Sequence, residues 1–282
     1  MRWQGRRQSR NVEDRRGMGA GYGGGPVRLG GLGLGGIIVV LALGYFLTGD
    51  PMGLLTDMPV SVDQGPSSGP APTGPPSDKA GQFAATVLAD TEETWHALFR
   101  DGGSAYQPPT LVLFDDEVRS ACGFADAAVG PFYCPADHKV YIDLRFFNDL
   151  AQRFGAPGDF AQAYVIAHEV GHHVQNLLGA FEEGQRLRQQ GADPNQISVQ
   201  QELQADCLAG VWGHFAQRRP GLLEPGDLEE GLAAAAAIGD DRIQRQTQGR
   251  VTPETWTHGS SAQRAEAFRR GLERGTLSAC GN

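Results

Sequence analysis

The stretch VIAHEVGHHVQ, residues 165–175, constrains the fold more than any other part of the chain. Its apolar residues predict a buried helix over residues 159–178, and on a helix positions four apart lie on one face. His168 and His172 are four apart and Glu169 follows the first, which is the pattern HExxH. Two imidazoles on one face can converge on a metal ion, and the glutamate can reach a water bound to it. Because buried polar groups need partners, the pattern indicates a zinc site rather than a polar surface helix.

A catalytic zinc ion takes three protein ligands and leaves one position for water. The candidate third ligand is Glu202, in the sequence QELQADCLAGVW of a predicted helix over residues 198–217. Asp206 follows four positions later on the same face and is expected to accept the free N–H of a ligating histidine. Cys207 lies about 140° round the helix from Glu202, which makes it a poor ligand. Gly171, between the histidines, costs about 1 kcal/mol of helix propensity relative to Ala and indicates close packing or substrate approach. We therefore expect one Zn²⁺ per chain.

A later segment, WTHGSSAQRAEAF, adds two candidate residues. His258 lies on a loop before a predicted helix over residues 261–273. From there it could donate a hydrogen bond to an oxyanion that develops near zinc. Arg264, in the first turns of that helix, could orient His258. Without the zinc site both residues would be ordinary.

Charge and composition predict how the chain is organised. Residues 1–28 carry seven arginines and two acidic residues, whereas residues 29–49 carry no charge. As a helix, 29–49 would be about 31 Å long, which matches the hydrocarbon core of a bilayer. The positive-inside rule then predicts a single-pass membrane protein with its N-terminus in the cytoplasm and everything after Asp50 outside it. The alternative is a cleaved signal peptide.

Residues 50–79 are rich in Pro, Gly and Ser and predict a disordered linker before a domain over residues 80–282. In that domain, residues 82–99 and most of the chain after residue 159 show helical periodicity, including a predicted helix over 226–247, while TLVLFDD and KVYIDL predict short strands. We expect an α+β fold that is mainly helical with a small β-sheet. The net charge of −9 disfavours nucleic acid as a partner, because an acidic domain repels phosphates. The oligomeric state is left open.

All four cysteines follow the predicted membrane span, where an oxidising compartment permits disulfides. Cys122 and Cys134 flank a loop that contains glycine and proline, and a local bridge is the natural pairing there. Cys207 and Cys280 then pair by elimination. The alternative is four free buried thiols.

The chain resembles the neutral zinc metallopeptidase family of bacterial single-pass membrane proteins. The resemblance covers the opening MRWQGRRQSRNVEDRRG, the hydrophobic span and the segments GPFYCPADHKVYIDL, AHEVGHHVQNLLG, ELQADCLAGVW and THGSSAQR. HExxH followed by E-x-x-A-D is similar to the gluzincin arrangement of zincin-type metalloproteases. The last segment is similar to the T-H-P-x-x-x-x-R element of membrane proteases related to the CAAX-processing endopeptidase, with Gly259 in place of proline. The resemblance also implies that KVYIDL supplies the edge strand along which zincins bind an extended peptide.

The expected function is that of a membrane-anchored zinc metalloendopeptidase, with peptide or protein substrates and the lipid bilayer as partners. Zinc would lower the pKa of its water, Glu169 would act as general base and His258 would stabilise the oxyanion. Asp206 and Arg264 would support these groups. One alternative is a zinc hydrolase of a non-peptide amide, including a deformylase-like enzyme with a cysteine ligand. The other is a catalytically silent binding protein of the same fold.

Overall fold

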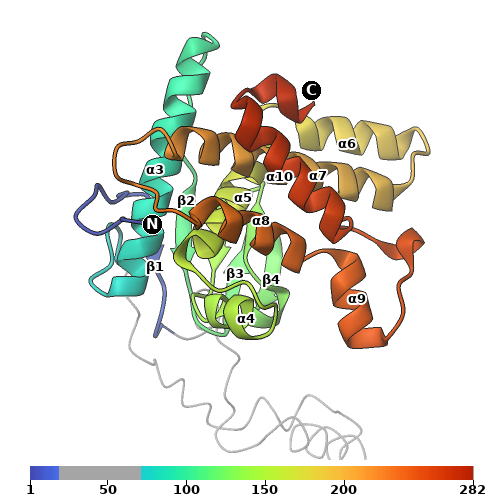
Figure 1. The fold of residues 1–282 in the computed structure, drawn as a ribbon, viewed down its shortest axis with the longest axis horizontal. Coiled ribbons are helices and arrows are strands. Elements are labelled where there is room, and N and C mark those ends of the chain that lie inside the picture. Colours follow the sequence, from blue (N-terminus) through green and yellow to red (C-terminus); the bar gives the residue numbers. More distant parts are fainter. Residues whose placement is uncertain (19–70, 282) are drawn as a thin grey trace, which may run out of the picture. The chain divides into compact units, whose positions relative to one another are not determined.

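The computed structural model describes residues 1–18 and 71–281, which build a mixed α and β fold (Figure 1). The helices are α3 (Lys79–Asp101), α4 (Phe146–Gln152), α5 (Asp159–Leu177), α6 (Ala180–Gln189), α7 (Pro194–Ala216), α8 (Asp227–Ala237), α9 (Asp240–Gln248) and α10 (Ser261–Arg274). The strands are β1 (Val12–Asp14), β2 (Thr110–Leu113), β3 (Glu117–Ser120), β4 (Gly123–Asp126), β5 (Phe132–Cys134) and β6 (Lys139–Ile142). Three short 3-10 helices complete the set: η1 (Ala127–Val129), η2 (Pro253–Thr255) and η3 (Leu277–Cys280).

Part of the predicted organisation lies outside the described residues. This holds for the membrane span over 29–49, for residues 19–28 and for most of the linker over 50–79. In the described part of the chain, no helix is both long enough and apolar enough to cross a membrane.

The four-stranded sheet has the order β1-β2-β6-β5 and is covered on both faces. β2 is parallel to both of its neighbours, and β5 is antiparallel to β6. Leu111 and Ile142 point to the face that packs against the helices, whereas Val112 and Tyr141 cluster with side chains of the β3-β4 hairpin. All four side chains are fully buried. The sheet is therefore a middle layer between the hairpin and the helices.

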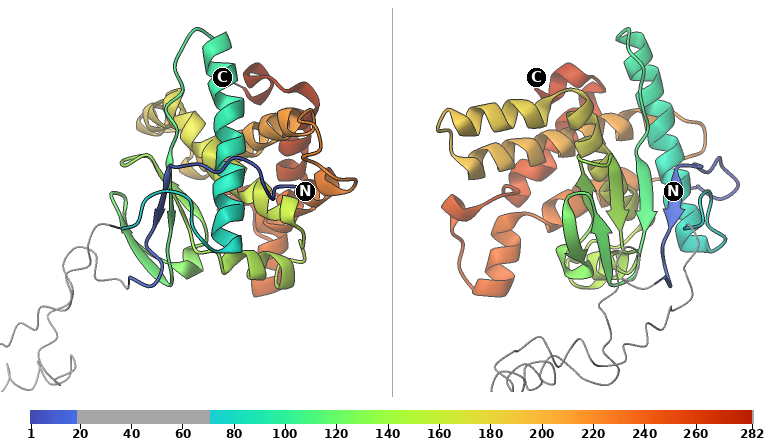
Figure 2. Two further views of the ribbon diagram at one scale, coloured as in Figure 1. Left: turned by 90° about the vertical axis from the view of Figure 1, so that its left-hand side faces the viewer. Right: turned by 180° about the vertical axis from the view of Figure 1, so that it is seen from behind.

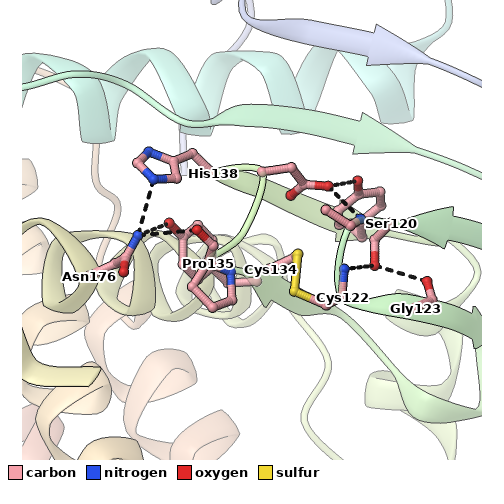
Figure 3. The surroundings of a disulfide bond; sticks show 11 residues. Ser120, Cys122, Gly123, Cys134, Pro135, His138 and Asn176 are labelled. Atoms are coloured by element: carbon pink, nitrogen blue, oxygen red, sulfur yellow. Dashed lines mark hydrogen bonds between the residues drawn. A yellow bond between two sulfur atoms is a disulfide. The ribbon is translucent and has the colours of Figure 1, made fainter. Parts of the chain in front are cut away.

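The edge of this sheet is β5 and not KVYIDL, which corrects the expected position of that segment. KVYIDL forms β6, and β6 lies between β2 and β5. The sequence FYC of β5 is too short to show the alternation that identifies a strand. A disulfide between Cys122 and Cys134 ties the end of β5 to the turn between β3 and β4 (Figure 3).

Helix α5 is the central element of the helical layer. It contacts α3, α7 and α8 as well as strands β5 and β6. The view from behind in Figure 2 shows the strands on the side of the unit opposite α8 and α10. Because neighbours surround α5, most of its residues are buried, including His168 and Glu169 of HExxH.

The predicted helix over residues 226–247 is two helices, α8 and α9. The break is at Gly239, where an added Cβ would lie 2.2 Å from the backbone nitrogen of Ser261. The first residue of α10 therefore packs directly against the break. This long-range contact has no local signal in the sequence.

Residues 1–17 belong to the same compact unit as residues 71–282. This corrects the predicted boundaries, which separate a basic segment 1–28 from a domain that starts at residue 80. Strand β1 forms the second edge of the sheet and Val12 is buried in the core. Ser9 and Arg7 donate hydrogen bonds to Glu92 of α3, against which this segment lies (Figure 2). The boundary was predicted from composition, and a strand of three residues leaves no periodic pattern.

The arginines of this segment form ion pairs within the folded unit. Arg2 pairs with Glu224, Arg7 with Glu92, and Arg16 with Asp14 and Asp78. Because β1 also pairs with β2, residues 1–17 are part of the folded unit.

Candidate metal centre

Helices α5 and α7 approach closely because a glycine lies between them. A Cβ added at Gly171 would lie 2.8 Å from the carbonyl oxygen of Ala205 and 3.2 Å from its Cα. These are backbone atoms, so a larger side chain would force the helices apart. The close packing predicted from Gly171 is therefore confirmed.

This approach brings His168 and His172 of α5 together with Glu202 of α7. One ligand atom from each residue lies within 4.8 Å of the other two. The Nε2 atom of His168 is 3.2 Å from Oε2 of Glu202, and Nε2 of His172 is 3.4 Å from Oε1. Both imidazoles thus direct the same nitrogen toward one carboxylate.

The second nitrogen of His168 is held by Asp206. Nδ1 of His168 lies 2.9 Å from Oδ1 of this fully buried carboxylate. The Asp206 carboxylate also accepts hydrogen bonds from the hydroxyl of Tyr164 and, at 2.8 Å, from Nε of Arg264. Asp206 is thus fixed from three sides, and its orientation fixes that of His168.

The second nitrogen of His172 is held by an amide. Nδ1 of His172 lies 2.8 Å from Oε1 of Gln175, a fully buried side chain almost one turn further along α5. With both Nδ1 atoms in hydrogen bonds, the nitrogen available to a metal is Nε2 on each ring. Two imidazoles and one carboxylate fit zinc with a position left for water, so His168, His172 and Glu202 would hold the ion.

Comparison with known sequences identifies the family of the chain. The sequence model of a family described as "Putative neutral zinc metallopeptidase" matches residues 1–282. The chain belongs to this family. It is 52% identical over 288 residues to uncharacterized protein YpfJ of Escherichia coli (strain K12), which covers 99% of this chain and 98% of the relative. It is 43% identical over 245 residues to uncharacterized protein Rv2575 of Mycobacterium tuberculosis (strain ATCC 25618 / H37Rv), which covers 82% of each. No solved structure matches the chain.

In the metal-free chain, burial and paired charges shift the pKa values of the residues around His168. Burial raises the pKa of Glu169, which makes this carboxylate a stronger base. Burial lowers the pKa of His168, but Asp206 and Glu202 outweigh that effect and raise the pKa to about 10. Burial also raises the pKa of Asp206, yet Arg264 and His168 hold it below the ordinary value. Asp206 is therefore ionised in the folded chain.

The loop that carries His258 is organised by Asp240 at the start of α9. Oδ2 of Asp240 accepts the backbone N–H groups of Thr257, His258 and Gly259 at distances of 2.8, 2.7 and 3.1 Å. Oδ1 lies 3.1 Å from Nδ1 of His258. The hydrogen bond with Asp240 raises the pKa of His258, and the charge of Glu202 adds to this effect. Asp240 thus holds both the backbone and the imidazole ring of His258.

The predicted orientation of His258 by Arg264 is wrong. Arg264 is buried against Asp206, and among the described residues no hydrogen bond joins it to His258. Gly259 has a φ of 90°, which proline cannot adopt. The loop therefore differs in backbone conformation from one with T-H-P in this place.

Both ring nitrogens of His173 form hydrogen bonds with groups other than the candidate metal ligands, as the position of His173 on the helix predicts. Its Nε2 lies 2.6 Å from the carbonyl oxygen of Gln107, and its Nδ1 lies 3.0 Å from the hydroxyl of Tyr133 in β5. Burial raises the pKa of Tyr133 to about 12, so its hydroxyl stays protonated and donates to His173. Asn176 donates to the same hydroxyl and lies beside His138 (Figure 3). These contacts hold the edge strand β5 against helix α5, which carries His168 and His172.

Both predicted disulfide pairings are confirmed. Cys122 is bonded to Cys134 and Cys207 to Cys280, so the alternative of four free thiols is wrong. A bonded Cys207 cannot bind a metal as a thiolate. The Cys207–Cys280 bridge joins α7 to the last described residues of the chain.

Three residues of the site were not predicted from the sequence: Tyr164, Gln175 and Asp240. Tyr164 precedes His168 by four residues and Gln175 follows His172 by three. Helix geometry places such residues side by side, so this spacing could have identified both. Asp240 is 18 residues from His258, and nothing local connects them.

Proposed function

We propose that this chain is a zinc metalloendopeptidase. The observation that carries the proposal is the convergence of His168, His172 and Glu202, with each imidazole held at Nδ1 so that Nε2 faces the shared carboxylate. Membership of a metallopeptidase family supports the same reaction class. Glu169 supplies a buried acid-base group directly beside the first ligand.

Bound zinc would provide a water of lowered pKa and would polarise the scissile carbonyl. Glu169 would accept a proton from the attacking water and return it to the leaving amine nitrogen. Its raised pKa suits both transfers, because general catalysis is most efficient when the pKa lies near the working pH.

His258 would donate a hydrogen bond to the carbonyl oxygen as negative charge develops there. Asp240 would keep the imidazole protonated and oriented, since it accepts from Nδ1 and holds three successive backbone N–H groups of the loop. Nε2 would remain as the donor toward substrate.

We propose an extended peptide as the substrate. Strand β5 has one neighbour in the sheet, β6, so its other edge can pair with a peptide backbone. Tyr133 of β5 is hydrogen-bonded to His173, the residue after the proposed ligand His172. This edge of the sheet is therefore held next to the helix that would bind the metal.

We also propose that the folded unit lies outside the cytoplasm and that residues 29–49 associate with a lipid bilayer. Two disulfides support an oxidising compartment, because cytosolic thiols are kept reduced. A hydrolase with a cysteine ligand has no support, since Cys207 is bonded to Cys280.

The test uses the full chain purified in detergent. Metal analysis should find about one zinc per chain. The chain should cleave unfolded proteins and members of a peptide library, with activity lost to a chelator and restored by zinc. His168→Ala should lose both zinc and cleavage. Zinc binding with no cleavage of any peptide would contradict the proposal and favour a silent binding protein.

A further inference from the structure

The hydrogen bond between His172 and Gln175 is one end of a chain of side-chain amides that extends to the C-terminal segment. Nε2 of Gln175 donates to Oε1 of Gln204 at 2.8 Å, and Nε2 of Gln204 donates to the carbonyl oxygen of Gly281 at 2.7 Å. Nε2 of Gln175 also donates to the backbone carbonyl oxygen of Gln201 at 2.7 Å. Three elements, α5, α7 and the segment after η3, are therefore linked through one set of hydrogen bonds.

In this series of side-chain amides, the backbone carbonyls with which it ends determine which group donates in each hydrogen bond. Backbone carbonyl oxygens can only accept, so the Gly281 carbonyl must face the NH₂ group of Gln204 and the Gln201 carbonyl must face that of Gln175. The oxygen of Gln204 is then left for the second N–H of Gln175. The oxygen of Gln175 in turn faces His172, and it can only accept.

An acceptor at this place selects one tautomer of His172. Nδ1 must carry the proton, and Nε2 then carries the lone pair that faces Glu202. Ligating histidines commonly give their second N–H to a carboxylate or a carbonyl, as His168 does to Asp206. His172 differs because its acceptor is neutral and is itself oriented by a relay. The two candidate ligands of α5 are thus held by different acceptors. The charged carboxylate of Asp206 holds His168, and the neutral amide of Gln175 holds His172.

We propose that Gln175 and Gln204 are positioning residues that hold His172 in the tautomer and orientation needed to bind a metal through Nε2. The anchor of this relay is the carbonyl of Gly281, which lies next to Cys280 and so beside its bridge to Cys207. The inference rests on the proposed zinc site but not on peptide hydrolysis.

The test measures zinc affinity of the full chain in detergent by competition with a chromophoric chelator. Outer residues that orient a ligand typically contribute about 10–100-fold to metal affinity, so Gln175→Ala should weaken zinc binding within that range and Gln204→Ala toward its lower end. The visible spectrum of the cobalt-substituted chain should change in both variants, because a rotated His172 alters the ligand geometry. The matched control is Gln200→Ala, an exposed glutamine of α7 with no hydrogen bond among those of the described residues. Its affinity and spectrum should be unchanged.

Gln175→Glu tests whether His172 needs the whole set of amide hydrogen bonds or only an acceptor at Nδ1. The carboxylate can still accept from His172, but its second oxygen would face the oxygens of Gln201 and Gln204 and repel them. Weakened zinc binding by this variant is expected, whereas affinity equal to the parent would overturn the relay. Parent-like affinity and cobalt spectra of Gln175→Ala and Gln204→Ala would overturn it as well. A parent chain that binds no zinc would instead overturn the proposed function, and the partly exposed Gln204 provides a test even if the buried Gln175 variants fail to fold.

Discussion

Gly171 of α5 lies against Ala205 of α7 so closely that an added Cβ would be 2.8 Å from the Ala205 carbonyl oxygen. Gly171→Ala would gain about 1 kcal/mol of helix propensity. It would lose about 1–3 kcal/mol to overpacking, because the Ala205 carbonyl is part of the backbone and cannot rotate away. We expect weaker zinc binding and no gain in melting temperature, since Glu202 would move away from the histidines.

The control for this change is Gly213→Ala on α7, where the nearest atom is the flexible Leu272 side chain at 3.3 Å. Zinc affinity of this variant should match the parent. Chelator competition and thermal unfolding measure both quantities. Equal zinc affinity of the two glycine variants would contradict the role of the Gly171 contact.

Glu169→Gln should keep the metal and the fold but lose hydrolysis. Glutamine matches glutamate in shape and cannot accept the proton from the attacking water. General base catalysis contributes about 10²–10⁴-fold, so kcat should fall within that range while zinc content stays at the parent level. Substantial peptidase activity in this variant would rule out Glu169 as the base.

Asp240→Asn should move the alkaline limb of the pH profile. The hydrogen bond from Asp240 raises the pKa of His258, so the protonated imidazole persists to higher pH in the parent. Removal of the carboxylate charge lowers that pKa, and the donor is then lost at a lower pH. The alkaline limb of kcat/KM should therefore shift toward lower pH, with zinc affinity unchanged. An unshifted limb would exclude His258 as the donor.

Cys280→Ser should weaken zinc binding as well as stability. The bridge to Cys207 spans 73 residues, and closing such a loop stabilises by about 4 kcal/mol in the chain-entropy model. Loss of the bridge also frees the Gly281 carbonyl that anchors Gln204. In a double variant with Cys280→Ser and Gln204→Ala, the loss of zinc affinity should therefore be smaller than the sum of the two single losses. A Cys280→Ser variant that retains zinc and melts like the parent would show that the C-terminal segment does not brace the site.

Residues 1–17 and the metal centre should lie on the same side of the membrane, because β1 pairs with β2 in one sheet. Cysteine labelling in intact cells can test this with Arg10→Cys and Glu273→Cys, two exposed positions of the unit. A membrane-impermeant maleimide should label both or neither before permeabilisation. Labelling of one position alone would place the two segments on opposite sides and contradict the packing of β1.

The sequence by itself determined the centre of the site, because the spacing of HExxH and of Glu202 with Asp206 is a property of a single helix turn. The pairing of Cys122 with Cys134 was predictable as well, because the two cysteines flank one short loop. The long helices α3, α5, α7 and α10 were also predictable, since each carries an apolar pattern many residues long.

The tertiary structure alone decided the contacts between segments far apart in the chain. Strand β1 is three residues long and gains its place only by pairing with β2. Asp240 reaches His258 because the chain breaks at Gly239 to receive the loop before α10. The amides of Gln175 and Gln204 acquire a direction only from carbonyls on other segments. Such contacts depend on distances in space, and no periodicity along the chain records them.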